Sequence, residues 1–191
     1  MAEEAGQVIV DEELDAQEEA RRRLALAQIR QWGDPALRLR ANEVESFDQD
    51  LERLVTRMIA LMRDAHGVGL AATQVGILRR VFVFVAQEHP ARAVVNPVVV
   101  DPSAETEVDE EGCLSLQDVR VPVERAVSVA VEGRDEKGEP VRLELQGLAA
   151  RVAQHEIDHL DGVLILDRTD PESRRGALRA LRPEPMLDAH L

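Results

Sequence analysis

The chain has 191 residues, of which 45% are hydrophobic, and a formal net charge of −14. This length predicts one domain with a good-sized core, and the acidity argues against general binding to DNA or RNA. The single cysteine, Cys113, excludes an intramolecular disulfide, and the apolar stretches are too short to span a bilayer. Because the acidic N-terminus also lacks the features of a signal peptide, we expect a cytoplasmic protein that binds neither DNA nor a membrane.

Three regions are predicted along the chain. Residues 1–24 begin with many acidic side chains and predict a mobile or loosely helical extension outside the core. Residues 25–170 are expected to form the folded domain. Residues 171–191 contain several arginines and predict a short C-terminal helix followed by a tail.

The domain is expected to open with a looped segment over residues 29–40, which contains a Gly-Asp-Pro turn signal. A helix is expected to follow Asp48, a suitable N-cap, because apolar residues recur at helical spacing over residues 51–62. Gly67 and Gly69 are expected to end that helix.

The middle of the chain predicts strands. Residues 81–85 and 94–100 are continuous apolar runs, which are typical of strands covered on both faces. Residues 127–145 alternate apolar and polar side chains on either side of an Asp-Glu-Lys-Gly turn, which is typical of a β-hairpin.

A second helix is expected over residues 148–160, with Leu148, Val152 and Ile157 facing the core and Gly162 ending it. Strands cluster between helices without a βαβ rhythm, so the predicted class is α+β. We expect antiparallel or mixed strands packed around a central helix, with an N-terminal helix before them and a short C-terminal helix after them.

The most informative motif is Gln154-His155-Glu156-Ile157-Asp158-His159, which lies on this central helix. Positions i and i+4 share a helix face, so His155 and His159 can bind one metal ion. Glu156 can then take a proton from a water molecule on that ion. The alternative is a surface helix with two unrelated histidines, but a metal site is the better interpretation of this HExxH sequence.

A third metal ligand is required, and Cys113 is the leading candidate. A free cysteine is often inert and buried, which is the competing interpretation. Here Gly112 precedes it and no apolar helical pattern surrounds it. A thiolate and two imidazoles leave the fourth tetrahedral position open for water or substrate. The remaining histidines, His66, His89 and His190, are interpreted as surface residues because their contexts are polar or turn-like.

A glycine-rich segment precedes these motifs and reads Gly67-Val68-Gly69-Leu70-Ala71-Ala72-Thr73-Gln74-Val75-Gly76. A phosphate-binding loop is one interpretation, but the lysine and the strand-to-helix setting of such loops are missing. A better interpretation is backbone that passes close to a substrate. Gln74 would then supply an amide donor that stabilises a developing oxyanion.

Taken together, the segments 67–74, 111–115 and 154–159 resemble the motifs of the peptide deformylases. These are metal hydrolases that remove the N-formyl group from the initiator methionine of nascent chains. The resemblance extends from about Ile29 to Arg168. One departure is visible, because Gln117 stands where the family often has a proline.

The resemblance implies a role for each matching residue. The implied metal ligands are Cys113, His155 and His159. Glu156 would be the general acid and base, while Gln74 and the backbone N–H of Leu114 would hold the formyl oxygen. The implied substrate-binding residues are Val68, Gly69, Gly112, Arg120, Leu148 and Val152. Among them the two glycines would pair with the peptide as an added strand, and Arg151 would border the methionine pocket.

The implied cofactor is one divalent metal ion, with Fe²⁺ favoured and Zn²⁺, Ni²⁺ or Co²⁺ as substitutes. The implied substrates are N-formylmethionyl peptides. Such an enzyme acts on chains that leave the ribosome, so a transient, salt-sensitive ribosome contact is expected through the C-terminal arginines Arg168, Arg174, Arg175, Arg179 and Arg182. The competing interpretation is a solvated helix whose arginines pair with neighbouring acids.

Two other functional classes remain open. One is an HExxH metallo-endopeptidase of another type, although no downstream Glu or His stands at a recognised ligand spacing. The other is a non-catalytic binding module of the same fold, although every catalytic position is intact. Loss of metal from a Cys113→Ser variant would support the deformylase interpretation, and retained metal would support the peptidase.

Overall fold

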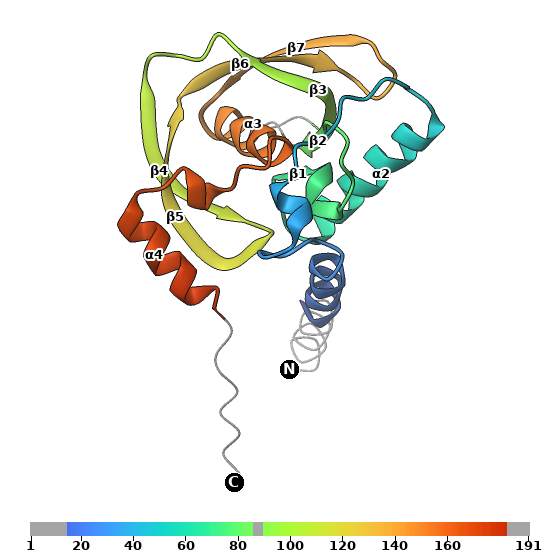
Figure 1. The fold of residues 1–191 in the computed structure, drawn as a ribbon. Coiled ribbons are helices and arrows are strands. Elements are labelled where there is room, and N and C mark those ends of the chain that lie inside the picture. The colour runs from blue at the N-terminus through green and yellow to red at the C-terminus, as the bar shows by residue number, and fades with distance from the viewer. Residues whose placement is uncertain (1–14, 86–89, 183–191) are drawn as a thin grey trace, which may run out of the picture.

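The computed structural model describes residues 15–85 and 90–182 and has the mixed helix and antiparallel-strand architecture predicted by the α+β class (Figure 1). A helix covers residues 15–26. The later elements, in chain order, are the 3₁₀ helix η1 (Pro35–Arg38), α2 (Gln49–Asp64), β1 (Gly69–Ala71), η2 (Ala72–Val75), β2 (Val81–Phe84), β3 (Arg92–Val100), β4 (Thr106–Cys113), β5 (Leu116–Ala126), β6 (Ser128–Arg134), β7 (Pro140–Gln146), α3 (Gly147–Leu160), η3 (Ile165–Asp167) and α4 (Pro171–Ala180). In the described ranges, no helix combines the length and the apolar character needed to cross a membrane.

The strands form a five-stranded sheet with the order β1-β2-β3-β6-β7 and a two-stranded sheet of β4 and β5, with antiparallel pairing throughout. The predicted hairpin is confirmed, because Val129 lies opposite Leu145 and β6 pairs with β7 along its length. Strand β4 was not predicted, since its acidic side chains are mostly exposed and give no apolar pattern. All of β2 is buried, as predicted for a strand covered on both faces. The same prediction was wrong for the end of β3, where Val98 is 57% exposed.

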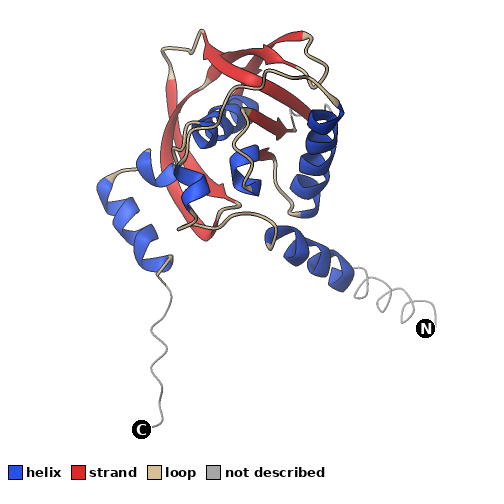
Figure 2. Cartoon of the chain, turned by 45° about the vertical axis from the view of Figure 1, so that its right-hand side comes forward, coloured by secondary structure: helices blue, strands red, loops and turns tan. Residues whose placement is uncertain are grey.

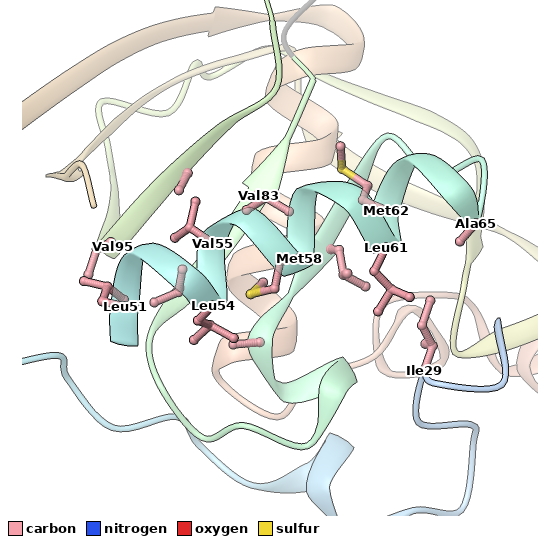
Figure 3. Close-up of a cluster of buried hydrophobic side chains, with 14 of the residues drawn as sticks. Ile29, Leu51, Leu54, Val55, Met58, Leu61, Met62, Ala65, Val83 and Val95 are labelled. Atoms are coloured by element: carbon pink, nitrogen blue, oxygen red, sulfur yellow. The ribbon is translucent and has the colours of Figure 1, made fainter. Parts of the chain in front are cut away.

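Helix α2 packs on β1 and β2 and buries one apolar face (Figure 3). It begins where predicted, because the Asp48 side chain accepts hydrogen bonds from the backbone N–H groups of Asp50 and Leu51. The predicted glycine stop was wrong: the helix ends at Asp64, and the left-handed residue that follows is His66, with φ 57°. Figure 3 also shows Ile29 beside this helix.

Helix α3, which carries the HExxH motif, packs against strands of both sheets and lies inside the curve of the strands (Figure 1). Val152 and Ile157 are buried in this interface as predicted. Leu148 is 63% exposed, so the expectation that it faces the core was wrong. It stands in the first turn of the helix, where the sheets no longer cover that side chain. Gly162, with φ 75°, follows the C-cap as expected.

The C-terminal helix α4 closes a third apolar cluster. Its Ala177 packs with the apolar side chains of β5, η1 and η3. Asp170 caps the helix by accepting hydrogen bonds from the backbone of Glu172 and Ser173. At the other end of the chain, the boundary expected between residues 24 and 25 falls inside the helix 15–26, whose last turn contributes the buried Ala25 to the core.

Candidate metal centre and substrate pocket

Three side chains from two elements converge at one point. His155 and His159 lie one turn apart on α3, and Cys113 is the last residue of β4. Their candidate ligand atoms all lie within 4.8 Å of one another. The Cys113 Sγ atom is 3.2 Å from His159 Nε2. The structure therefore brings together the three residues that the sequence singled out as ligands.

The surroundings of His155 suit a metal ligand. Its Nδ1 is 3.0 Å from Oε2 of the buried Glu111, which fixes the ring and leaves Nε2 for a metal. Burial alone would raise the pKa of Glu111, but its bonds to His155 and Arg125 outweigh burial and hold that pKa at about 2. Glu111 is therefore a carboxylate at neutral pH. Its role was not predicted, although it stands inside the quoted cysteine motif.

A buried arginine, Arg125, links Glu111 to a second buried carboxylate, Asp158. Arg125 donates to Glu111 Oε1 at 2.9 Å and to Oε2 at 3.1 Å, and it also donates to Asp158. Asp158 in turn accepts two bonds from Arg168. No sequence pattern pointed to Arg125, since its position opposite these acids depends on strand pairing. Asp158 was visible only as an unassigned position of the HExxH sequence.

Glu156 lies in a narrow space between α3 and β1. It is 4% exposed, and burial raises its pKa to about 7 in the metal-free protein. A Cβ placed on Gly69 would be 2.4 Å from Glu156 Oε1, so this strand leaves room for the carboxylate only because it has a glycine there. A carboxyl group whose pKa is near neutrality can both accept and release a proton.

Two buried polar atoms at this centre lack partners. Among the described residues, Glu156 Oε2 and His159 Nδ1 make no hydrogen bond. Burial, together with the nearby charges of His155 and Arg125, lowers the pKa of His159 well below its usual value, so its ring is neutral. Buried polar atoms normally have partners. The unpartnered Glu156 oxygen and the sulfur and nitrogen donors therefore fit a bound metal ion with a water molecule or substrate beside it. The His159 nitrogen next to Cys113 Sγ is Nε2, so the unpartnered Nδ1 faces away from that position.

Gln74 is held in one orientation next to the candidate metal ligands. Its Oε1 accepts a hydrogen bond from the backbone N–H of Ala71 at 2.8 Å. Its Nε2 donates to Ser115 Oγ at 3.1 Å and lies 3.7 Å from Cys113 Sγ. The amide nitrogen therefore points toward the cysteine, which is where an oxyanion donor would be needed.

A pocket of about 790 Å³ opens over this centre. The predicted site residues line it, except for His159, which is buried behind the others. Val68 and Leu148 are half-exposed or more and offer apolar surface to the pocket. The lining also includes residues that were not predicted, notably Arg22 and Leu26 of the helix 15–26.

Three neighbouring residues make contacts that were not predicted. Arg151 borders the pocket, but its guanidinium bonds to Glu111 and to the backbone carbonyls of Val123 and Glu107. Gln117, at the usual proline position, donates to Gln31 Oε1 at 2.9 Å. The side chain of His66 is half-exposed, as expected, but it also pairs with Glu18 and lines the pocket.

The two other histidines expected on the surface, His89 and His190, lie outside the described residues.

Comparison with known proteins shows the family of this chain. Residues 26–175 match the family model described as polypeptide deformylase. Peptide deformylase 1 of Corynebacterium glutamicum is 48% identical over 83% of this chain and 96% of its own length. The crystal structure of peptide deformylase from Thermotoga maritima superposes with a TM-score of 0.72 at 50% identity, covering 75% of this chain and 97% of that one. A peptide deformylase from Synechococcus elongatus in complex with actinonin gives a TM-score of 0.76 at 38% identity, covering 80% of this chain and 85% of that one. The chain therefore belongs to the polypeptide deformylase family.

Proposed function

We propose that the chain removes the N-formyl group from the N-terminal methionine of newly made polypeptides, releasing formate and a free amine. Membership of the deformylase family supports the reaction. One observation carries the assignment of the site: Cys113 and the two motif histidines converge beside the buried, unpartnered carboxylate of Glu156.

Cys113, His155 and His159 would hold one divalent metal ion. A donor set of one thiolate and two imidazoles suits Fe²⁺, Zn²⁺, Ni²⁺ or Co²⁺, and we favour Fe²⁺ from the family resemblance. When bound, such an ion supplies a Lewis acid that polarises the formyl carbonyl and makes a neighbouring water molecule more acidic. Glu111 fixes the ring of His155 during this chemistry.

Glu156 moves the proton. It accepts a proton from the attacking water as the new C–O bond forms, and returns it to the leaving nitrogen as the C–N bond breaks. The Gln74 amide and the backbone N–H of Leu114 donate hydrogen bonds to the formyl oxygen while it carries negative charge. The hydrogen bond from Gln74 Nε2 to Ser115 Oγ joins the two segments that supply these donors.

The remaining pocket residues bind the peptide. Gly69 and Gly112 offer backbone to an added strand, because neither has a side chain that would separate the chains. The methionine side chain contacts the apolar group of Val68, Leu148 and Val152, all of which line the pocket. Arg120 lines the pocket beside Gly112, its partner across the β4–β5 pair.

A Glu156→Gln variant tests the assignment. It should retain metal, measured by elemental analysis of anaerobically purified protein, and lose formate release from formyl-Met peptides, because an amide cannot carry the proton. Glu110→Gln is the matched control, since it removes an exposed carboxylate that borders the same pocket. Substantial formate release by Glu156→Gln at normal metal content would refute the role of this residue. Metal retained by Cys113→Ser would instead favour the other HExxH class.

The identity of the metal has its own test. A thiolate bound to redox-active Fe²⁺ forms a centre that oxidants attack. Peroxide should therefore inactivate the iron form much faster than the nickel or zinc form, measured as residual formate release over time. Equal rates for the iron and nickel forms would contradict the proposal of iron.

We also propose a transient ribosome contact in the cytoplasm, carried by fewer arginines than expected. Arg168 and Arg174 pair with Asp158 and Asp167, so the basic surface left for a partner is that of the exposed residues Arg175, Arg179 and Arg182. Replacing these three with Gln should reduce co-sedimentation with ribosomes at low salt and leave peptide deformylation intact. Unchanged co-sedimentation would indicate a solvated helix end.

A further inference from the structure

All of the helix 15–26 except its last residue, Leu26, lies before the part of the chain that matches the deformylase family model, which begins at residue 26. Figure 2 shows it projecting from the body of the molecule. Most of its side chains are exposed. The match to the family model therefore does not account for the position of this helix, which has to be explained by its own contacts.

Three contacts fix the helix against the body. Ala25 at its end and Ile29 just after it are buried in the cluster that α2 forms. Gln28 Oε1 accepts a hydrogen bond from Arg57 Nη2 at 3.3 Å. Farther out, Glu18 Oε1 is 3.0 Å from Nε2 of His66, the left-handed residue after α2. The helix is thus attached at its base and again about two turns away.

One face of the helix turns toward the substrate pocket. Glu18, Arg22 and Leu26 are spaced four residues apart and so share a face. The first of them pairs with His66, and the other two line the same pocket as His155 and Glu156. The pocket therefore continues without interruption from the candidate metal centre to this helix.

We propose that the helix 15–26 forms an outer wall of the peptide groove, and that Leu26 and Arg22 contact the residues that follow the formyl-methionine. This inference rests on the proposed function. A pocket of about 790 Å³ is large enough to take more than the terminal residue of a peptide. The apolar Leu26 packs against the stem of a downstream side chain, and Arg22 attracts a carboxylate at its end.

The positive charge of Arg22 determines which peptide side chains the outer wall should prefer. Within the described residues, Arg22 makes no ion pair, so its guanidinium is available to a substrate. At the peptide position next to Arg22 the wall thus favours an acidic side chain over a neutral one, and a neutral one over a basic one. The exposed Glu110 and Asp118, which line the same pocket, act in the opposite direction on a charged side chain placed near them. Because the site is solvent-exposed, the preference is modest, about two- to fivefold in kcat/KM, and falls as salt rises.

The test uses metal-loaded full-length protein and three series of formyl-Met peptides. Each peptide has four alanines after the formyl-methionine. In the first series one alanine is replaced by Glu, and in the second by Lys, at each of the four positions in turn. The third is the unsubstituted alanine peptide. At one or more positions the wild-type protein should give the largest kcat/KM for the Glu peptide. In Arg22→Ala the kcat/KM values of the Glu and Lys peptides should become equal. In Arg22→Glu the Lys peptide should have the larger kcat/KM. Arg21→Ala and Arg23→Ala are matched controls, since both arginines are exposed on the same helix and neither lines the pocket.

The outcomes separate this inference from the proposed function. No formate from any peptide would refute the proposed function itself. Formate release with a Glu-to-Lys ratio that Arg22→Glu leaves unchanged would refute the outer wall alone. If Arg21→Ala changes the Glu-to-Lys ratio as much as Arg22→Ala does, the preference is a general charge effect, and the outer-wall proposal is refuted.

Discussion

The replacement of Gly69 with Ala tests the arrangement of the catalytic carboxylate most directly. The added Cβ would lie 2.4 Å from Glu156 Oε1, 2.8 Å from Val152 Cγ1 and 2.9 Å from Glu156 Cδ. Gly69 does not have a positive φ, so alanine adds a steric clash without backbone strain. An ordinary contact begins near 3.4 Å, and the carboxylate would therefore have to move by about 1 Å.

The added methyl group should affect turnover more than the stability of the fold. The Glu156 carboxylate is the end of a flexible chain and can move aside, whereas Val152 is β-branched and stiff. Overpacking of this kind costs about 1–3 kcal/mol of the free energy of unfolding. A displacement of about 1 Å at a catalytic group lowers turnover by about 100-fold. We therefore expect a folded, metal-containing variant with very low kcat.

The assay measures kcat and KM from formate release, metal content, and the free energy of unfolding in urea. Gly176→Ala on α4 is the control, because a Cβ there meets nothing within 4 Å and alanine favours a helix. It should keep full activity and gain slightly in stability. If Gly69→Ala keeps kcat within twofold of wild type, then Glu156 either lies elsewhere or does not need its observed position, and the reasoning fails.

Two further predictions concern the groups around the metal ligands. Gln74→Leu should lower kcat by about 100-fold with little change in metal content, because an oxyanion donor is lost; it should also destabilise the fold, since the buried N–H of Ala71 loses its acceptor. A kcat close to wild type would exclude Gln74 as that donor. Arg125→Met should cost about 3–5 kcal/mol in urea unfolding and reduce metal retention, because the buried carboxylates of Glu111 and Asp158 lose a shared partner. Arg142→Met is its control, because that exposed arginine also has several acidic partners, and equal losses in the two variants would contradict the importance of burial.

Local sequence patterns determined the elements whose stability depends on near neighbours. The N-cap of α2 and the β6–β7 hairpin follow from side chains within a few residues of one another. The pair His155 and His159 likewise requires only one helical turn. Local periodicity is enough for these features, because a helix or hairpin brings such residues together in any fold that contains it.

Sequence motifs pointed to Cys113 and Gln74, and resemblance to a known family added Leu114, but local pattern alone could not place them beside the histidines. Cys113 reaches His159 across 46 residues of sequence only because β4 and β5 pair and face α3. Strand β4 itself was missed, since a mostly exposed strand rich in acids has no apolar alternation to reveal it.

The charged network behind the site and the proposed outer wall of the pocket depend on tertiary structure alone. Glu111, Arg125 and Asp158 meet because strand pairing and helix packing place them together, and no spacing in the chain encodes that meeting. The same holds for Arg22, which composition assigned to an extension outside the core. Composition measures how an isolated segment interacts with water, whereas the position of the helix 15–26 depends on the buried Ala25 and on the pairing of Glu18 with His66.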